Sequence, residues 1–323
     1  MFKVSVIIPV YGVEKFIERC ARSLFEQTLE DIEFIFVDDC TPDRSMDILR
    51  QLCDEYRFRC AKDNKRVRMV RMPSNSGQAA VRRHGIHLAE GEYVIHCDSD
   101  DWVEIDMYRI MYEKAIKEES DVVICDFNNT DGLSFSQSVK GCYSNSKEQF
   151  ITDILYHRTS WAVWNKLVKK ELYESIDCYP QFAMGEDMVF ITQVILNSRK
   201  ISYVSDSLYN YYYNPSSIMN TQTEIQCMNK YLQLKGNTDI LLPFLERKLD
   251  KSYYERIKRV FAYNTTITLF PYIHKTDFFV LWKQEMLPCY KILFDKNVKF
   301  IFKIMYILLI LRVYPLYKSF RYA

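Results

Sequence analysis

Short apolar runs alternate with amphipathic segments over the first 127 residues of the chain. Continuous apolar runs are typical of strands buried on both faces, whereas apolar residues that recur every three or four positions are typical of helices. Thr41 is the expected N-cap of the second helix, with Pro42 at its first position. The predicted strands are 4–9, 34–37, 67–70, 93–97 and 122–125, and the predicted helices are about 16–24, 41–56, 79–89 and 107–117.

This alternation predicts an α/β fold in which a mostly parallel sheet is covered by helices on both faces. Sheets of this kind bind ligands beyond the carboxyl ends of their strands. Functional side chains are therefore expected just after Pro9, Val37, Val70 and Cys97.

The pattern changes in the second half of the chain. Residues 128–145 are polar and rich in turn-forming residues, which predicts a connecting loop, and beyond residue 214 the pattern becomes helical and aromatic. We therefore expect a nucleotide-binding α/β domain over 1–215 and a helical region over 216–323. The apolar stretch 300–311 is shorter than the roughly 20 residues of a spanning helix, so it is either a core helix or a helix lying in a membrane interface.

Composition narrows the functional classes. The 323 residues are 48% apolar and 26% charged, which indicates an ordered globular protein. A net charge of +1 argues against nucleic-acid binding, although residues 291–323 hold seven basic residues and one acidic residue. Ten cysteines without a C-x-x-C pair, and first residues that lead straight into a strand pattern, predict reduced thiols in the cytoplasm. The glycine-rich motifs of dehydrogenases and P-loop NTPases do not occur.

Three carboxylates follow the strand 93–97 within four residues. Asp98, Asp100 and Asp101 would repel one another unless a cation offset their charge. Carboxylate oxygens suit Mn²⁺ or Mg²⁺, which commonly binds one or two carboxylates together with substrate phosphates. An isolated D-x-D triplet equally fits a solvated acidic turn, but its position at the expected ligand-binding edge favours a metal site.

Two further charged positions belong to the same edge. Asp39 follows the strand 34–37, where a carboxylate accepts hydrogen bonds from a base or from ribose hydroxyls. Arg82 lies near the start of the helix 79–89, and a guanidinium beside a helix N-terminus suits a diphosphate. Arg83 is the alternative residue for that role.

Two clusters lie farther along the chain. Glu186 and Asp187 precede an apolar helix, and such a pair either shares general-base chemistry or caps the helix. Trp164, Asn165 and Lys166 combine groups that suit stacking on a sugar and hydrogen bonding to it, or simply the packing of an amphipathic helix. Together with Asp101, they are the candidate contacts to the acceptor or sugar.

In their order along the chain, several motifs resemble the family-2 inverting glycosyltransferases. The match covers roughly residues 3–215, and the ordered set is far more specific than any single motif. Gly12 and Arg83 depart from the pattern, which usually has asparagine at both positions. The matching motifs are VSVIIPVY at 4–11, VDD at 37–39, NSG at 75–77 with Arg82, GEY at 91–93, DSDD at 98–101, WNK at 164–166 and GED at 185–187.

This resemblance implies a GT-A fold, a UDP-sugar or similar donor, and a divalent metal. It implies that Asp100 binds the metal and that Asp98 lies near both the metal and the nucleoside. It also implies that Asp187 is the general base, with Glu186 beside it in the catalytic pair. Residues expected to line the nucleotide site are Pro9, Tyr11, Asp39, Arg82 and Asp98.

The expected acceptor is a saccharide or a lipid-linked oligosaccharide of surface-polysaccharide synthesis at the inner face of the cytoplasmic membrane. The tyrosine-rich run 209–213 and the basic, apolar tail are compatible with such an acceptor and with peripheral membrane contact. One alternative is a sugar nucleotidyltransferase, which would need a glycine-rich loop after the first strand that this chain lacks. The other is a catalytically silent scaffold of a polysaccharide-assembly complex, against which the retention of both acidic pairs argues.

Overall fold

The computed structural model describes residues 2–62, 65–133, 135–141, 144, 146–213 and 223–311. The chain forms two compact units, one over Met1–Ile151 and Thr159–Pro215 and the other over Thr152–Arg158 and Ser216–Ala323. Helix α5 (Lys147–Leu155) begins in the first unit and ends in the second.

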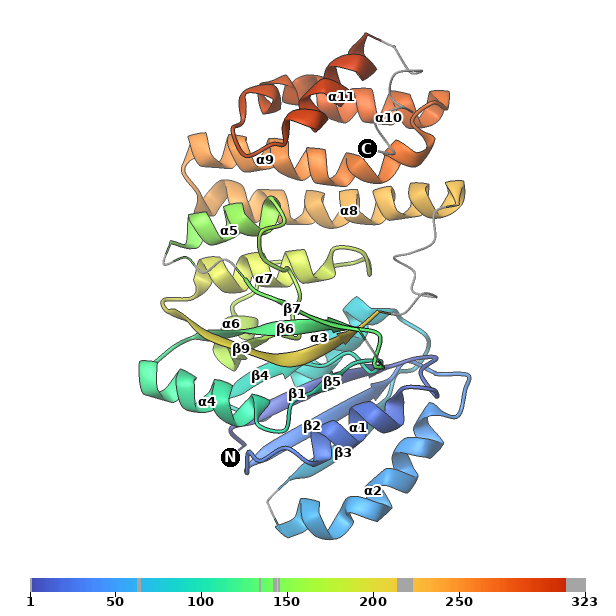
Figure 1. The fold of residues 1–323 in the computed structure, drawn as a ribbon, viewed down its shortest axis with the longest axis vertical. Helices are drawn as coiled ribbons and strands as arrows, with labels where there is room; N and C mark the ends of the chain where they lie inside the picture. Colours follow the sequence, from blue (N-terminus) through green and yellow to red (C-terminus); the bar gives the residue numbers. More distant parts are fainter. Residues whose placement is uncertain are drawn as a thin grey trace. The chain divides into compact units, whose positions relative to one another are not determined.

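The first unit is built on one twisted sheet (Figure 1). Within the described residues, nine strands hydrogen-bond in the order β3-β2-β1-β4-β8-β6-β9-β5, with β7 paired to β6. The long ladders between β1, β2, β3 and β4 and between β6 and β9 are parallel, and the short ladders that β5, β7 and β8 form are antiparallel. The strands are β1 (Val4–Val10), β2 (Ile32–Asp38), β3 (Arg66–Arg71), β4 (Tyr93–His96), β5 (Trp102–Val103), β6 (Val122–Thr130), β7 (Ser136–Val139), β8 (Lys166–Lys169) and β9 (Ile201–Tyr212).

Helices cover both faces of this sheet, as the buried strands require. Val6 and Ile8 of β1 belong to the core cluster that contains the apolar face of α1. Ile7, which points to the opposite face, meets α3 so closely that a Cβ on Gly85 would lie 2.4 Å from its Cγ2. The helices of this unit are α1 (Ile17–Phe25), α2 (Ser45–Lys62), α3 (Gln78–Leu88), α4 (Met107–Glu118), α6 (Lys170–Glu174) and α7 (Glu186–Asn197).

The predicted fold class is confirmed, and two local predictions are wrong. Helix α2 begins at Ser45 and not at Pro42 after an N-cap at Thr41. The Asp43 carboxylate accepts from the backbone N–H and the hydroxyl of Ser45, whereas the Thr41 hydroxyl donates to Asp43. The expected loop 128–145 is partly a hairpin, in which β6 continues to Thr130 and pairs with β7. Residues 134, 142, 143 and 145 of that stretch lie outside the described residues.

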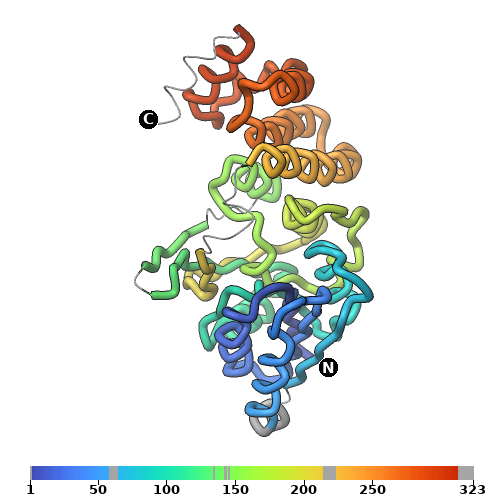
Figure 2. Tube along the Cα trace, turned by 90° about the vertical axis from the view of Figure 1, so that its right-hand side faces the viewer, coloured from blue at the N-terminus to red at the C-terminus, as the bar shows by residue number. Residues whose placement is uncertain are grey.

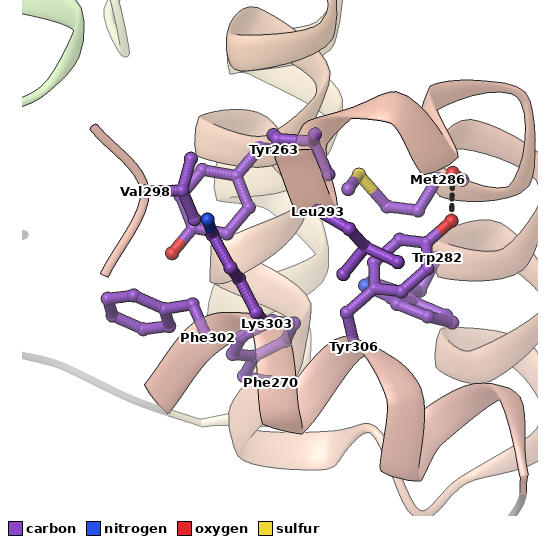
Figure 3. Close-up of a pocket in the computed structure, with 10 residues that line it drawn as sticks. Tyr263, Phe270, Trp282, Met286, Leu293, Val298, Phe302, Lys303 and Tyr306 are labelled. Carbon is purple, nitrogen blue, oxygen red and sulfur yellow. Dashed lines mark hydrogen bonds between the residues drawn. The ribbon is translucent and has the colours of Figure 1, made fainter. Parts of the chain in front are cut away.

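The second unit is helical, as expected for this part of the chain (Figure 2, orange to red). The Thr223 hydroxyl and the Gln226 side chain form a capping box that begins the first long helix. Figure 3 shows an apolar cavity that Trp282 and Tyr306 line, with a volume of only about 10 Å³, which is room for about one water molecule. The helices are α8 (Glu224–Lys248), α9 (Lys251–Thr266), the 3-10 helix η1 (Ile267–Tyr272), α10 (Thr276–Met286), the 3-10 helix η2 (Leu287–Phe294) and α11 (Phe300–Ile310).

Helix α11 packs part of its surface into the core of the second unit and leaves other apolar side chains exposed. Tyr306 and Leu309 are buried in the core of the second unit, and the Tyr306 hydroxyl donates to the Met286 carbonyl at 2.7 Å. Ile307 and Ile310 on the same helix are exposed. Across the described residues, no helix is both long enough and apolar enough to cross a bilayer.

Candidate active site

The buried guanidinium of Arg82 lies at the centre of the predicted site. Its Nη2 donates to Asp98 Oδ1 at 2.5 Å, and its Nη1 donates to Glu186 Oε1 at 2.5 Å and to Asp187 Oδ1 at 2.6 Å. Only 2% of the Arg82 side chain is exposed, against 22% of Asp98 and 27% of Asp187. The structure therefore brings together four predicted site residues from three separate segments of the chain.

Local structure in each of the three segments explains the position of its charged side chains. Asp98 follows β4, whose four residues are all buried. Arg82 lies in the second turn of α3, which begins after Gly77, a residue with φ +79°. Gly185 has φ +80°, which the absence of a Cβ permits, and this turn places Glu186 and Asp187 in the first turn of α7.

Burial dominates the electrostatics of this cluster. It raises the pKa of the Glu186 carboxyl to about 8 and also raises the pKa of Asp187, although the Arg82 charge opposes both shifts. Three carboxylates against one guanidinium would leave a net negative charge in a poorly solvated place, so retention of a proton on Glu186 relieves it. Asp187 is the more exposed member of the pair and has the access to solvent that a proton acceptor needs.

The acidic loop 98–101 is held in place from β9. The Tyr209 hydroxyl accepts from the Asp98 backbone N–H at 3.0 Å and donates to Asp101 Oδ2 at 2.6 Å. The other Asp101 oxygen accepts from the backbone N–H of Tyr212 at 2.7 Å, and Asp101 is fully buried. These contacts show a structural task for Asp101, while its contact with an acceptor or sugar stays a prediction.

Arg19 of α1 also contacts the acidic loop. Its guanidinium lies 3.7 Å from the centre of the Trp102 ring and 4.9 Å from that of Tyr212, and its Nη2 donates to the Asp100 carbonyl at 2.9 Å. The cation therefore positions the backbone of Asp100, the predicted metal ligand.

Three of the predicted nucleotide-binding residues, Pro9, Tyr11 and Asp39, lie in or just after β1 and β2. Asp39 is 5% exposed, and its two oxygens accept from the backbone N–H groups of Ser76 at 2.7 Å and Gly77 at 2.9 Å. Asp39 thus holds the loop that leads into α3. Tyr11 is 52% exposed beyond the end of β1, and Pro9 is half-buried within that strand.

The segment 164–166 is buried. The Trp164 ring stacks on Tyr209 at 4.2 Å and 12°, beneath the residue that holds the acidic loop. Lys166 Nζ donates to the carbonyls of Ser160 and Ala162 and to Asn165 Oδ1, at 2.7–2.9 Å. Burial lowers the pKa of Lys166 to about 7, and the Asp187 charge opposes that shift. These contacts position the site, and direct contact of the three side chains with a sugar stays a prediction.

Sequence reasoning missed several residues around the cluster. Gln78 donates to Asp98 Oδ1 at 3.4 Å, and its position four residues before Arg82 on one helix was the available signal. Tyr209 belongs to the tyrosine-rich run that the sequence makes compatible with a lipid-linked acceptor, whereas its side chain is fully buried and holds the acidic loop. His96 and Tyr173 are buried near Arg82, and within the described part of the chain neither the His96 ring nitrogens nor the Tyr173 hydroxyl has a hydrogen-bond partner.

The residues suit a metal only in combination with another ligand. The described part of the chain holds no group of three or more His, Cys, Asp or Glu side chains arranged to bind a metal ion. The Asp98 carboxylate accepts from Arg82 and the Asp101 carboxylate accepts from Tyr209, and Asp100 stays the predicted metal ligand. One carboxylate plus phosphate oxygens is a common ligand set for Mg²⁺, so the donor set fits a metal that arrives with a phosphorylated substrate.

The chain is similar in sequence to known glycosyltransferases. The model of the family described as glycosyl transferase family 2 matches residues 5–187. The uncharacterized glycosyltransferase EpsJ of Bacillus subtilis is 33% identical over 71% of this chain and 66% of its own length. TarS of Staphylococcus aureus, a poly(ribitol-phosphate) beta-N-acetylglucosaminyltransferase, is 26% identical over 76% of this chain and 44% of its own length. The chain thus spans about two thirds or less of these relatives.

Solved structures show the same fold. TarS residues 1–349 in complex with UDP-GlcNAc superpose with a TM-score of 0.65 at 21% identity, covering 90% of this chain and 81% of that chain. A mannosyltransferase from Pyrobaculum calidifontis in complex with GDP-Man and Mn²⁺ gives a TM-score of 0.56 at 14% identity, covering 98% of this chain and 82% of that one. These likenesses identify the fold as GT-A, and the family model covers more than half of the chain. The chain belongs to glycosyl transferase family 2.

Proposed function

We propose that the protein transfers a sugar from a nucleotide-diphosphate sugar, a UDP-sugar in the first instance, to an acceptor hydroxyl with inversion at the anomeric carbon. The observation that carries this proposal is the Arg82 cluster. It joins the acidic loop after β4 to the Glu186-Asp187 pair at the start of α7. In a TarS structure of this fold the bound molecule is UDP-GlcNAc, which supports a nucleotide-sugar donor.

Asp187 is the proposed general base. Its carboxylate is partly exposed, and its second oxygen remains for the acceptor hydroxyl while Oδ1 accepts from Arg82. The hydroxyl would transfer its proton to Asp187 as it attacks the anomeric carbon, and the sugar–phosphate bond would break on the opposite side. Arg82 and the buried, protonated Glu186 would orient the base. General-base assistance of this kind typically contributes about 10²–10⁴-fold to the rate.

A divalent cation, Mn²⁺ or Mg²⁺, is proposed at Asp100, with Asp98 beside it. When bound, it offsets negative charge on the leaving nucleoside diphosphate. The charge balance of the site supports it. The carboxylates around Arg82 outnumber its single positive charge, so the cluster offers no excess positive charge to a diphosphate. Pro9, Tyr11 and Asp39 are proposed to contact the nucleotide, and residues 1–215 to form the catalytic domain.

The acceptor is proposed to be a saccharide or a lipid-linked oligosaccharide of bacterial surface-polysaccharide synthesis. TarS is named for transfer to poly(ribitol-phosphate), which supports an envelope polymer as acceptor. The helical region 216–323 is proposed to face the acceptor or the inner surface of the cytoplasmic membrane. The exposed Ile307 and Ile310 of α11 offer an apolar contact for that surface. Replacing both by serine should reduce sedimentation with bacterial membranes, and unchanged sedimentation would contradict this contact.

The test of the catalytic proposal is Asp187→Asn. Transfer should fall by at least the general-base factor, about 10²-fold or more, while Mn²⁺-dependent protection by the nucleotide against thermal unfolding persists. Asp100→Ala should lose both properties. Asp206→Asn, which changes an exposed aspartate of β9, is the matched control and should keep both. Near-normal turnover of Asp187→Asn would refute the assignment of the base.

The donor and the two alternatives require separate assays. A panel of nucleotide-sugars, each tested with Mn²⁺ for protection against thermal unfolding, identifies the donor. Pyrophosphate release from a sugar-1-phosphate and a nucleoside triphosphate would indicate a nucleotidyltransferase. Failure to hydrolyse or transfer any bound donor would indicate a silent scaffold.

A further inference from the structure

We propose that a basic pocket in the second unit binds the phosphate group of an anionic phospholipid at a bilayer surface. The pocket is defined by residues of α9, η2 and the two residues that follow η2. The inference deepens the proposed membrane contact and rests on that part of the proposed function. It does not depend on the donor or on the identity of the base.

The pocket is open to solvent, with a volume of about 570 Å³. That is large enough for a phosphate headgroup, in contrast to the nearby apolar cavity, which has room for about one water molecule. Its lining residues are Arg256, Arg259, Val260, Tyr290, Lys291, Ile292, Phe294, Asp295 and Lys296.

The charge of this lining suits an anion. Arg256 is balanced by Asp295, whose Oδ2 accepts from Arg256 Nε at 3.1 Å and from the Tyr156 hydroxyl at 2.5 Å. Arg259, Lys291 and Lys296 have no ion-pair partner among the residues that the structure describes. Three uncompensated cations around one open pocket repel one another, and a bound phosphate would relieve that repulsion.

Exposed aromatic side chains on the same pocket favour a bilayer over a free anion. Phe294 is 80% exposed and Tyr290 is 53% exposed, although both line the pocket. The segment is nevertheless anchored, because Cys289, which precedes Tyr290, and Ile292, which lies between the two aromatic residues, are buried in the core. A bilayer surface satisfies both features, since aromatic rings enter the headgroup region while basic side chains meet lipid phosphates. A soluble phosphate would leave the two rings in water.

The test uses the full-length protein and sedimentation with vesicles. Vesicles of phosphatidylcholine alone should bind weakly, and vesicles that contain phosphatidylglycerol should bind strongly and in a salt-sensitive manner. The triple variant Arg259→Gln, Lys291→Gln and Lys296→Gln should lose affinity for the anionic vesicles on the order of 10²-fold, because each cation near such a surface contributes about five-fold. Phe294→Ser should lose affinity for the anionic vesicles on the order of 10-fold, because serine lacks the apolar ring whose transfer from water to the bilayer favours binding.

The matched control changes the same net charge in the same unit. Lys248, Lys251 and Lys283 are exposed and do not line the pocket, and their triple replacement by glutamine should keep most of the binding. Equal losses of vesicle affinity in the two triple variants would refute the proposed binding site, because non-specific attraction between basic residues and anionic lipid would then explain the binding. Inorganic phosphate that protects the wild type but not the pocket variant from thermal unfolding, without vesicle binding, would assign the pocket to a free anion and also overturn the proposal.

The membrane contact and the pocket can fail separately. If serine at Ile307 and Ile310 abolishes vesicle binding while the pocket variant binds normally, the membrane contact stands and the pocket is overturned. If the wild type binds neither kind of vesicle, both proposals fail. Transfer to a water-soluble acceptor should be the same in the pocket variant and the wild type, which checks that the variant is folded.

Discussion

Replacing Glu186 by glutamine should remove a pH-dependent part of the stability of the first unit. Burial raises the pKa of Glu186 from an ordinary value of 4.5 to about 8. Between these two values the folded protein holds a proton that the unfolded chain has released, so stability is full below pH 4.5 and falls as the pH rises toward 8. At about 1.4 kcal/mol per pH unit, Glu186 alone should lower the free energy of unfolding by about 2–3 kcal/mol between pH 5.5 and pH 7.5.

Glutamine is the appropriate replacement because it resembles the protonated carboxyl in shape and still accepts from Arg82 through its amide oxygen. The free energy of unfolding would be measured in urea at several pH values, by tryptophan fluorescence in a Trp282→Phe background that removes the signal of the second unit.

The decisive quantity is the difference in the free energy of unfolding between wild type and variant. Other groups also change the free energy of unfolding of the wild type with pH. Burial lowers the pKa of His96, which makes stability rise with pH below about 6.5. The wild type should lose about 2–3 kcal/mol relative to Glu186→Gln from pH 5.5 to pH 7.5. Exposed Glu30 offers the matched control, and Glu30→Gln should follow the wild type across this range. A wild type and a Glu186→Gln variant with parallel pH profiles would refute the proposed proton on Glu186.

Three other substitutions test the supports of the site. Tyr209→Phe removes the hydroxyl that donates to buried Asp101, and the free energy of unfolding should fall by about 1–3 kcal/mol in a denaturant titration. Arg19→Lys removes the donor to the Asp100 carbonyl and the stacked guanidinium, so the nucleotide should protect less strongly with Mn²⁺ in a thermal shift assay, with little change in its absence. Gly185→Ala strains a residue at φ +80°, so stability should fall by about 1–2 kcal/mol and transfer should fall with it in a donor-turnover assay. A variant that behaves like the wild type in its assay would refute the structural task assigned to the residue that it replaces.

Most of the fold was predictable because β1, β2, β4 and the first five residues of β6 are almost entirely buried. Such strands read as continuous apolar runs, and the five predicted strands are present as β1, β2, β3, β4 and β6. The boundaries depended on local competition that the apolar pattern does not record. Asp43 outcompetes Thr41 as the group that begins α2, and β6 continues past its apolar run because β7 and β9 provide backbone partners for its polar end.

The identity of the site residues was predictable, but their tasks depended on contacts that local sequence does not encode. Arg82 was expected to meet a diphosphate, and the structure shows it bound to Asp187, 105 residues away, and to two other carboxylates. Asp101 resembles Asp100 in every local respect, yet the Tyr209 hydroxyl, 108 residues away, holds it inside the fold. A carboxylate that accepts from protein donors on both oxygens positions its neighbours, whereas one that faces solvent is available to a metal or to an acceptor hydroxyl. The motif 98–101 therefore contains a carboxylate with a structural task, and only a donor far away in the sequence reveals that task.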